Sequence, residues 1–417
     1  MRIVFFNPVG EIGGAERVLL LLLAELKNCD SRNDAAKIEP LVLLGSDGPL
    51  RNEAERLGIA VDVLPLPAAL LAFGDSQLSR KQGGGFLSRL RILCRAALSL
   101  PVGILYLVRL RRKLRELAPD LIHSNGLKTH LVAALSRPRR TQLLWHLHDF
   151  LGDRALVGRM LRMLRRRATL AVANSDAVRD DAAPLLRPLE ITTIHNGIDV
   201  ARFSPAPGDG ASLDRLASLS PAPPNTVRVG LVATYARWKG HETFLRAAAE
   251  ILRNAPPAPL RFYIVGGPIY RTAGSQHSEQ ELRGLTAELG LANHVGFVPF
   301  QPDTAAIYRA LDVVVHASTR REPFGLTIVE AMSCGRAVVT SAAGGAAEIA
   351  EPGTNCLAFP LGDVAELAAA IKKLADAPAL RERLGQGGRA TAADRFAAPV
   401  MGRAFAELYR SLHRQVR

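Results

Sequence analysis

Residues 313–340 of the chain are VVVHASTRREPFGLTIVEAMSCGRAVVT, and this stretch decides the fold class. Two short apolar runs rich in β-branched residues, Val313–His316 and Ala337–Thr340, predict strands that are buried on both faces. Between them, Gly325–Cys334 has the apolar spacing of a helix. A strand, a helix and a second strand form the repeating unit of a parallel sheet, so we expect an α/β fold.

The same alternation of strand and helix extends from this stretch in both directions. Further strands are expected at Ile3–Phe6, Pro40–Leu44, Asp120–His123, Gln142–His148, Thr169–Ala173, Ile191–His195, Val227–Ala233, Arg261–Val265 and His294–Val298. Further helices are expected at Ala15–Leu26, Leu127–Leu135, Ala155–Arg166, Gly240–Arg253, Gln280–Leu289, Val364–Leu374 and about Pro399–Arg417.

The alternation stops at residues 204–225, which are rich in Pro, Gly, Ser and Ala and are typical of a connection with one short helix. We therefore expect two doubly wound, Rossmann-like domains, residues 1–203 and 226–395, with ligands bound in the cleft between them. Residues 396–417 are expected to form a C-terminal helix that packs back towards the N-terminal domain.

The chain has 417 residues and a net charge of +14, and the basic residues are concentrated in two regions. Residues 80–115 hold ten Lys and Arg and no acidic residue, and residues 154–167 hold six arginines. Such regions attract polyanions, and we expect contact with an anionic membrane surface through them. The alternative is a helix pair packed on the sheet with solvated arginines. Aromatic residues are only 5% and no nucleic-acid motif is present, so nucleic acid is not an expected partner.

The four cysteines are scattered without Cys-x-x-Cys spacing, which argues against a disulfide framework or a zinc site and favours a reducing compartment. The apolar run at the start is too short for a signal segment. The longest uncharged stretch of the basic region, Ala96–Val108, is too short for a helix that crosses about 30 Å of hydrocarbon. We expect a cytoplasmic protein, peripheral at the inner membrane face.

A short motif follows the first strand of each of the two expected domains. Gly13 and Gly14 precede a helix, and a glycine turn before a helix N-terminus is a phosphate-binding arrangement. Arg237 and Lys239 come where ligands bind at the carboxyl edge of such a sheet, and these cations could neutralise a diphosphate. The simpler alternatives are a tight turn and a solvated lysine.

The segment after Val313–His316 carries the strongest motif. Glu322 precedes the expected helix, which has Pro323 in its first turn, and Glu330 lies about two turns into it. Carboxylates there could hold the hydroxyls of a sugar or ribose, or they could be ordinary surface glutamates. Backbone N–H groups at the helix start could hold a phosphate, namely those of Phe324, Gly325 and Leu326.

Histidines mark the expected strand end at 142–148. His146 and His148 point to the same face of a strand, but no Asp or Cys cluster accompanies them, so we expect a catalytic or substrate-positioning role and no metal site. His123, Asn125 and Lys128, at another strand end, are expected to line an acceptor pocket together with His146, with a polar helix cap as the alternative for the first three.

In order and spacing, these motifs resemble the retaining glycosyltransferases of family 4, the group 1 transferases with the GT-B fold. The resemblance covers almost the whole chain. Its motifs are Gly13–Glu16, His148–Asp149, Asn174–Ser175, Asn196–Asp199, the Glu-x7-Glu pair Glu322 and Glu330, Cys334–Val339, Gly344–Ile349, Gly353–Leu357 and Pro360–Asp363.

The resemblance implies roles for individual residues. Glu330 would bind the donor ribose, Glu322 the transferred sugar, Lys239 the diphosphate and His148 the reaction centre, while Gly14 would offer its backbone to phosphate. One departure is Thr234, which stands where the family usually has an arginine; we expect Arg237 to supply that cation.

The expected function is transfer of a sugar, with retention of anomeric configuration, from a nucleotide-sugar donor to a glycan or lipid-linked acceptor, in the synthesis of cell-surface polysaccharide or glycolipid. The sequence contains no Asp-x-Asp, so we expect metal-independent transfer without a cofactor. Two alternatives stay open at this point: a GT-B sugar-nucleotide epimerase, and a non-catalytic protein that binds a sugar nucleotide or a membrane.

Overall fold

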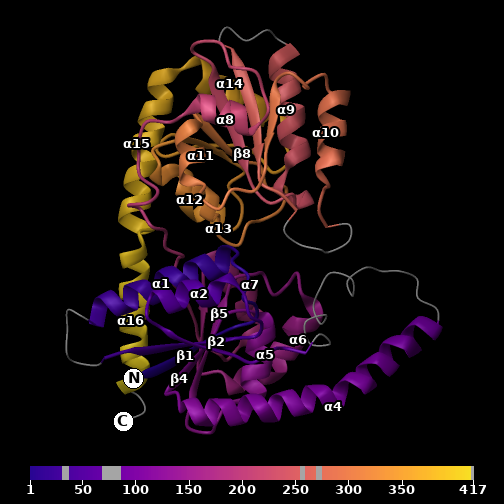
Figure 1. Cartoon of the computed structure of the whole chain (residues 1–417), viewed down its shortest axis with the longest axis vertical. Helices are drawn as coiled ribbons and strands as arrows, with labels where there is room; N and C mark the ends of the chain where they lie inside the picture. The colour runs from indigo at the N-terminus through magenta and orange to yellow at the C-terminus, as the bar shows by residue number, and fades with distance from the viewer. Residues whose placement is uncertain (31–36, 68–85, 254–258, 269–274, 415–417) are drawn as a thin grey trace. The chain divides into compact units, whose positions relative to one another are not determined.

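The computed structural model describes residues 1–30, 37–67, 86–253, 259–268 and 275–414, with residues 29, 30 and 86–100 described by their backbone. The chain forms two compact units (Figure 1). Unit 1 consists of Met1–Gly197 together with Ala398–Arg417, and unit 2 of Ile198–Ala397.

Unit 1 is built on a seven-stranded sheet in which every pair of neighbouring strands is parallel, in the order β3-β2-β1-β4-β5-β6-β7. The strands are β1 Arg2–Asn7, β2 Glu39–Leu44, β3 Ala60–Val63, β4 Leu121–Ser124, β5 Gln142–Leu147, β6 Leu170–Ala173 and β7 Ile191–Thr193. The strand order reverses between β1 and β4, and this switch point is where doubly wound sheets bind ligands.

Helices cover both faces of the unit 1 sheet. The helices are α1 Gly14–Asp30, α2 Pro49–Arg56, α4 Phe86–Leu117, α5 Leu127–Ser136, α6 Ala155–Leu164, α7 Asp176–Leu186 and α16 Ala398–Arg414, with a 3-10 turn η2 at Arg165–Arg167. Helices α4 to α7 share a core with Val4 and Phe6 of β1. Phe5 points to the opposite face, where its ring contacts Tyr409 of α16, which packs beside α1.

Unit 2 repeats this design with six parallel strands in the order β10-β9-β8-β11-β12-β13. The strands are β8 Val227–Val232, β9 Leu260–Val265, β10 Val295–Val298, β11 Val313–His316, β12 Ala337–Thr340 and β13 Leu357–Ala358. The helices are α8 Gly210–Leu216, η3 Arg237–Lys239, α9 His241–Arg253, α10 Glu279–Glu288, α11 Ala305–Ala310, α12 Leu326–Ser333, α13 Gly345–Ile349, α14 Val364–Asp376 and α15 Pro378–Arg395. Its switch point lies between β8 and β11.

The expected α/β class and all the expected strands and helices are confirmed, with small shifts at their ends. One expectation at an element boundary is wrong. Helix α12 begins at Leu326 after the N-cap Gly325, so Pro323 lies in the preceding loop and outside the first helical turn. The reason is the left-handed backbone of Gly325, with φ 114°, which delays the helix start.

The described part of the basic insertion contains helix α4; residues 68–85 lie outside the described residues, so the alternative of a helix pair stays a prediction. Tyr106, Leu110 and Leu114 of α4 are buried against the sheet. Within the described residues, no helix combines the length and the hydropathy needed to span a bilayer.

Candidate functional site

The turn that carries Lys239 in unit 2 follows β8 and lies against the end of β11. Gly240 ends η3 with a left-handed φ of 78°, and a Cβ added to it would lie 1.8 Å from the carbonyl oxygen of Ala317. Only glycine fits a left-handed turn at that separation. This close approach brings Lys239 beside the loop that leads from β11 to α12.

Lys239 and Glu322 form a largely buried ion pair at this switch point. The Lys239 Nζ lies 2.8 and 3.0 Å from the two carboxylate oxygens of Glu322, and the two side chains are 17% and 10% exposed. The same ammonium lies 4.0 Å above the ring centre of Trp238. A lysine has three N–H donors, so one remains for a further acceptor after both carboxylate oxygens are met.

Two more side chains contact the Glu322 carboxylate. Ser318 donates its hydroxyl over 3.0 Å, and His316 Nε2 lies 3.1 Å away. Burial alone would raise the pKa of Glu322, but the charge of Lys239 and the contact with His316 outweigh it and hold that pKa well below its usual value. Glu322 is therefore an anion whose orientation is fixed by three neighbours.

The loop from Glu322 to Gly325 is held from the other side by the glycines before α13. Gly345 N–H donates to the Glu322 carbonyl over 2.7 Å, and Glu322 forms an isolated parallel bridge with Gly344. A Cβ on Gly344 would lie 2.5 Å from the Glu322 carbonyl oxygen. The Gly344–Gly345 pair is thus required for the close backbone approach that sets the start of α12.

Glu330 lies on α12 and is 9% exposed. Its carboxylate accepts a hydrogen bond of 2.9 Å from the hydroxyl of Tyr308, which comes from α11 and is buried. A charge-assisted bond of this kind fixes the rotamer of the carboxylate. The structure therefore brings Lys239 and Glu322 into contact, and Phe324, Gly325 and Leu326 follow Glu322 at the start of α12, the helix that carries Glu330.

Arg237 points to a different neighbour. Its guanidinium lies 2.8 Å from Glu281 of α10 and 3.1 Å from Nδ1 of His277. Thr234 follows β8 and is partly buried. The contact of Arg237 with a diphosphate, in place of the arginine absent at Thr234, stays a prediction.

In unit 1, hydrogen bonds join residues from the ends of three adjacent strands. His148 Nε2 lies 2.5 Å from Asn125 Oδ1, and Asn125 Nδ2 donates to Asn7 Oδ1 over 2.8 Å. Asn7 Nδ2 contacts the Glu16 carboxylate over 3.3 Å, which also accepts the N–H of Gly13 over 3.0 Å. The structure thus connects His148, Asn125 and the Gly13–Gly14 turn through side chains at the switch point.

His123 and His146 lie deeper, between the sheet and α16. His123 contacts the Tyr409 hydroxyl over 2.6 Å and His146 over 3.1 Å, and both histidines are buried. The rings of His146 and His148 are 4.0 Å apart. Lys128 is partly exposed in the first turn of α5. The expected acceptor role of these residues stays a prediction.

These histidines are neutral at pH 7. Burial lowers the pKa of His148 to about 4, and burial together with the neighbouring His148 lowers that of His130 to about 3. The pKa values of His123 and His146 lie well below 6.5 for the same reasons. In the part of the chain that the structure describes, no group of three or more His, Cys, Asp or Glu side chains is placed to hold a metal ion.

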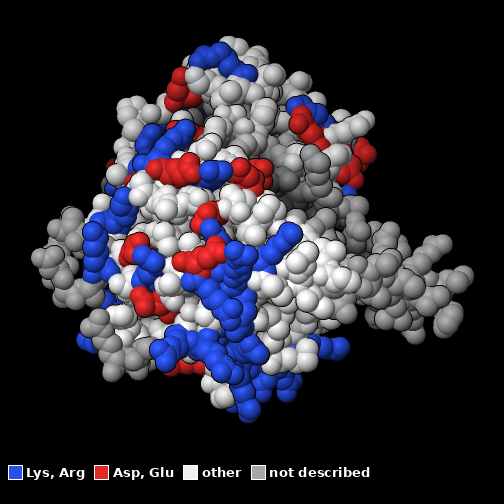
Figure 2. All heavy atoms as spheres, turned by 60° about the horizontal axis from the view of Figure 1, so that its bottom comes forward, with Lys and Arg blue, Asp and Glu red and all other residues white. Residues whose placement is uncertain are grey.

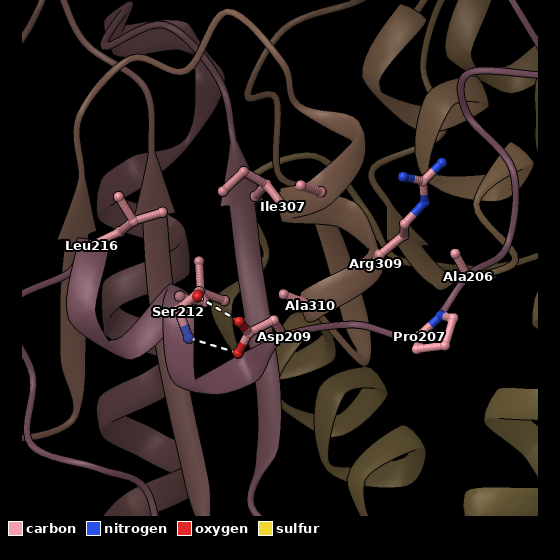
Figure 3. Close-up of a pocket in the computed structure, with 10 residues that line it drawn as sticks. Ala206, Pro207, Asp209, Ser212, Leu216, Ile307, Arg309 and Ala310 are labelled. Atoms are coloured by element: carbon pink, nitrogen blue, oxygen red, sulfur yellow. Dashed lines mark hydrogen bonds between the residues drawn. The ribbon is translucent and has the colours of Figure 1, made fainter.

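A pocket elsewhere in unit 2 is not the candidate site. Asp209, Ser212 and mostly apolar side chains of α8 and α11 line it, and Asp209 accepts the N–H of Ser212 over 2.8 Å as the N-cap of α8 (Figure 3). None of the site residues expected from the sequence lines this pocket.

The sequence analysis missed four residues that contact the expected ones: Asn7, Tyr308, His316 and Ser318. Glu16 belongs to the Gly13–Glu16 motif, but no role was expected for its side chain. Asn7 and His316 could have been found, because each is a polar residue that ends a buried strand beside the switch point. Tyr308 carries no such signal, since its partner is 22 residues away on another helix.

Two doubly wound units in one chain, each with polar side chains at its switch point, define the GT-B class. The family description "Glycosyl transferases group 1" matches residues 220–391, and "Glycosyltransferase Family 4" matches residues 49–202. The chain belongs to this family, the group 1 glycosyltransferases of family 4.

Among curated relatives, the D-inositol 3-phosphate glycosyltransferase of Actinosynnema mirum is 32% identical over 219 residues, which are 51% of this chain and 50% of that protein. The protein of the same name from Streptomyces bingchenggensis is 30% identical over 269 residues, 62% of this chain and 54% of that protein. The chain spans about half the length of these curated relatives.

Solved structures match the chain over its whole length. HepE of Anabaena, in complex with UDP and glucose, is 28% identical with a TM-score of 0.76, covering 99% of this chain and all of that one. Sucrose-phosphate synthase of Thermosynechococcus elongatus is 20% identical with a TM-score of 0.75, covering the whole of both chains, and demonstrates the shared fold alone.

Proposed function

We propose that the protein transfers a sugar from a nucleotide-sugar donor to a hydroxyl of a glycan or lipid-linked acceptor, with retention of anomeric configuration and without a metal ion. The observation that carries this proposal is the buried Lys239–Glu322 pair beside the N-terminus of α12, at the switch point of unit 2. A fixed cation beside a fixed anion suits a nucleotide sugar, because its diphosphate needs a cation and its sugar hydroxyls need a hydrogen-bond acceptor.

In the reaction, the bond between the anomeric carbon and the diphosphate oxygen breaks, and a bond from that carbon to the acceptor oxygen forms. The electron pair of the broken bond stays on the diphosphate, and the acceptor proton leaves with it. The third N–H of Lys239 and the backbone N–H groups at the start of α12 stabilise the charge that develops there. Glu322 accepts hydroxyl groups of the transferred sugar.

Glu330 holds the ribose of the donor. A carboxylate accepts hydrogen bonds from two adjacent hydroxyls, and the bond from Tyr308 leaves Glu330 oriented for this contact. Anabaena HepE was solved with UDP-glucose, so a UDP-hexose is the first donor to test. The name of the curated relatives makes an anionic polyol acceptor, inositol 3-phosphate, the first acceptor to test.

The test is a screen of the full chain against UDP-, GDP-, ADP- and dTDP-sugars in the presence of a chelator. We expect thermal stabilisation by one nucleotide, and slow hydrolysis of its sugar. Glu330→Gln should lose the stabilisation, whereas Glu322→Gln should keep nucleotide binding and lose most of the turnover. Stabilisation by none of the nucleotides, or a strict need for a divalent ion, would contradict the proposal. Sugar-nucleotide isomerisation without an acceptor would favour an epimerase.

A second proposal concerns a membrane surface, and it rests on one face of unit 1. Helices α4, α5 and α6 pack side by side, and their outer residues are both apolar and basic. Figure 2 shows Lys and Arg side chains gathered in a band on the side where α4 lies. The exposed apolar residues are Val102, Ile104, Leu105, Val108, Leu135, Leu156 and Met163, and Met163 is 74% exposed. The exposed arginines of α4, of α6 and of the following turn η2 are Arg109, Arg112, Arg115, Arg159, Arg162, Arg166 and Arg167.

This mixture suits an anionic lipid surface, because arginines meet the headgroups while the apolar side chains enter the interface. We expect the protein to sediment with vesicles that contain phosphatidylglycerol and to stay in solution with phosphatidylcholine alone. Arg162→Glu with Arg166→Glu, and separately Met163→Ser, should weaken this binding. Phe300→Ser is the control, since Phe300 of unit 2 is 51% exposed and lies on no such face. Equal binding to both vesicle types would contradict the proposal.

A further inference from the structure

Hydrogen bonds connect Asn7, Asn125 and His148, and the donor and the acceptor of each bond can be assigned in turn, beginning at Asn7. The Asn7 side chain places one amide atom 2.7 Å from the Val9 carbonyl oxygen and 3.3 Å from a Glu16 carboxylate oxygen. A carbonyl oxygen only accepts hydrogen bonds, so the atom of Asn7 that faces Val9 is the NH2 group. This holds even if Glu16, whose pKa is raised by burial, carries a proton.

The orientation of Asn7 decides that of Asn125. With the Asn7 NH2 group directed at Val9, its Oδ1 faces Asn125, and the Asn125 atom 2.8 Å away must be the donor Nδ2. The Asn125 Oδ1 then faces His148. Both asparagines are buried, with exposed fractions of 0% and 3%, so water does not replace their side-chain partners.

The last bond of the series reaches His148. Asn125 Oδ1 lies 2.5 Å from His148 Nε2, and an amide oxygen can only accept, so Nε2 must carry the proton. A neutral imidazole has one N–H, which leaves Nδ1 with a lone pair. Within the described residues, the hydrogen bond at Nε2 is the one that the His148 side chain makes, and this side chain is partly exposed.

We infer that Asn7 and Asn125 are positioning residues that hold His148 as the neutral tautomer protonated at Nε2, so that Nδ1 accepts a hydrogen bond from a hydroxyl of the bound sugar or acceptor. The inference rests on the proposed function for the nature of the ligand, because a sugar supplies hydroxyl donors. It also restricts the ligand: a carbonyl, carboxylate or phosphate oxygen placed at Nδ1 would meet a lone pair and be rejected. Asn125 acts here through His148.

Long-range nitrogen–proton NMR of the full chain with labelled histidine tests this directly, since each tautomer has its own pattern of nitrogen shifts and couplings. The His148 signal is identified as the one lost in His148→Gln. We expect the Nε2-protonated pattern at pH 7. The Nδ1-protonated pattern, or an even mixture of the two, would overturn the inference.

Two substitutions of Asn125 should change two different properties of His148, its tautomer and the pH at which it titrates. Asn125→Leu removes the acceptor, and we expect the His148 signal to move towards a mixture of tautomers. Asn125→Asp replaces the amide by a carboxylate in direct contact, which should raise the pH at which His148 titrates by about one to three pH units. An unchanged titration in Asn125→Asp would overturn the inference even if Asn125→Leu failed to fold.

The matched control is Asn174→Leu. Asn174 is 3% exposed, follows the neighbouring strand β6, and its Oδ1 has no hydrogen-bond partner. We expect this variant to leave the tautomer and the titration of His148 unchanged. A similar change in both variants would mean that the effect is general loosening of unit 1, and would overturn the inference.

Kinetics separate a positioning role from a structural one. Asn125→Leu should lower kcat while nucleotide affinity stays near that of the unmodified chain, because the nucleotide groups proposed above lie in unit 2. Equal loss of kcat and of nucleotide affinity would contradict the role. If no nucleotide sugar is turned over at all, the proposed function fails, and the NMR result still decides the tautomer.

Discussion

At the scale of single residues, the candidate site is controlled by side chains that hold the ligand-binding groups in place. Glu330 has its rotamer set by Tyr308, and Glu322 by Lys239, His316 and Ser318. A carboxylate that is already oriented loses less conformational entropy when a ligand binds. Tyr308, His316 and Ser318 should therefore affect binding and turnover without contacting the ligand.

Tyr308→Phe removes one hydroxyl from a buried ring and leaves the packing of α11 intact. The hydrogen bond to a charged group contributes about 1.5–3 kcal/mol, so we expect nucleotide affinity to fall roughly tenfold or more. Isothermal titration of the nucleotide identified by the screen measures this. The kcat at saturating donor should stay close to that of the unmodified chain; a fall in kcat with unchanged affinity would contradict the role of Tyr308.

Lys239→Met tests the ion pair through stability. Removing one partner of a buried pair leaves an unpaired charge, and we expect the free energy of unfolding to fall by about 3 kcal/mol. The double variant Lys239→Met with Glu322→Gln should be more stable than Lys239→Met alone, because no unpaired carboxylate remains. Urea unfolding of the chain, of Lys239→Met, of Glu322→Gln and of the double variant measures the coupling; strictly additive losses would mean that the pair is not coupled.

At the scale of elements, the strand-to-helix turns position the site, and glycine makes them possible. Gly240→Ala would place a Cβ 1.8 Å from the Ala317 carbonyl oxygen, so the turn with Lys239 must move. The left-handed backbone alone costs about 1–2 kcal/mol in a non-glycine residue. We expect a larger loss of stability than this, together with a loss of nucleotide binding.

Gly290→Ala is the matched control for this prediction. Gly290 also has a left-handed backbone, with φ 72° against 78° at Gly240, but a Cβ there meets no atom within 4 Å. Thermal unfolding should reveal only the backbone cost in Gly290→Ala, and nucleotide binding should persist. Equal losses in the two variants would mean that contact with Ala317 contributes nothing.

The positions of the helices and strands were largely predictable, because the strands are continuous apolar runs and most helices between them have apolar residues at a regular helical spacing. The two strands not foreseen, β3 and β13, sit at or near the sheet edge, and β13 has only two residues. Helix α15 was missed because its sequence contains three glycines and only two strongly apolar side chains, Leu380 and Leu384, over 18 residues. Its stability comes from packing on α12, which no local pattern reveals.

The candidate site was predictable where its residues belong to short motifs after strands, as for Lys239, Glu322 and Gly13. It was not predictable where a partner is distant in sequence. Glu281 lies 44 residues from Arg237, and it pairs with the guanidinium that the sequence suggested for a diphosphate. Tyr409 lies 286 residues from His123, so nothing local indicated that this histidine is held under α16. Long-range contacts of this kind are set by the tertiary fold.

At the scale of the whole molecule, burial of neutral histidines should make stability depend on pH. Six of the ten histidines have pKa values below the usual 6.5, mainly because of burial: His123, His130, His146, His148, His241 and His277. For His130 and His241 the pKa falls to about 3, and for His148 to about 4. Both units contain such residues.

The sign of the effect follows from proton binding. Unfolded histidines titrate near pH 6.5, so between pH 6.5 and about 4 the unfolded chain binds more protons than the folded chain. The free energy of unfolding should therefore be constant above pH 7 and should fall as the pH drops through this window. Each such histidine contributes a slope of up to about 1.4 kcal/mol per pH unit. Scanning calorimetry between pH 7.5 and 5 should show a steadily falling Tm.

One substitution and its control assign that slope to buried histidines. His130→Leu removes a fully buried ring whose Nε2 has no hydrogen-bond partner, so the slope between pH 7 and 5 should become smaller even if stability at pH 7.5 changes. His294→Gln alters an exposed histidine and should leave the slope unchanged. Carboxylates such as Glu322, whose pKa is depressed, lose their contribution only at lower pH, so they cannot produce a slope in this window. A Tm independent of pH from 7.5 to 5 would mean that these histidines are reached by water in the folded chain.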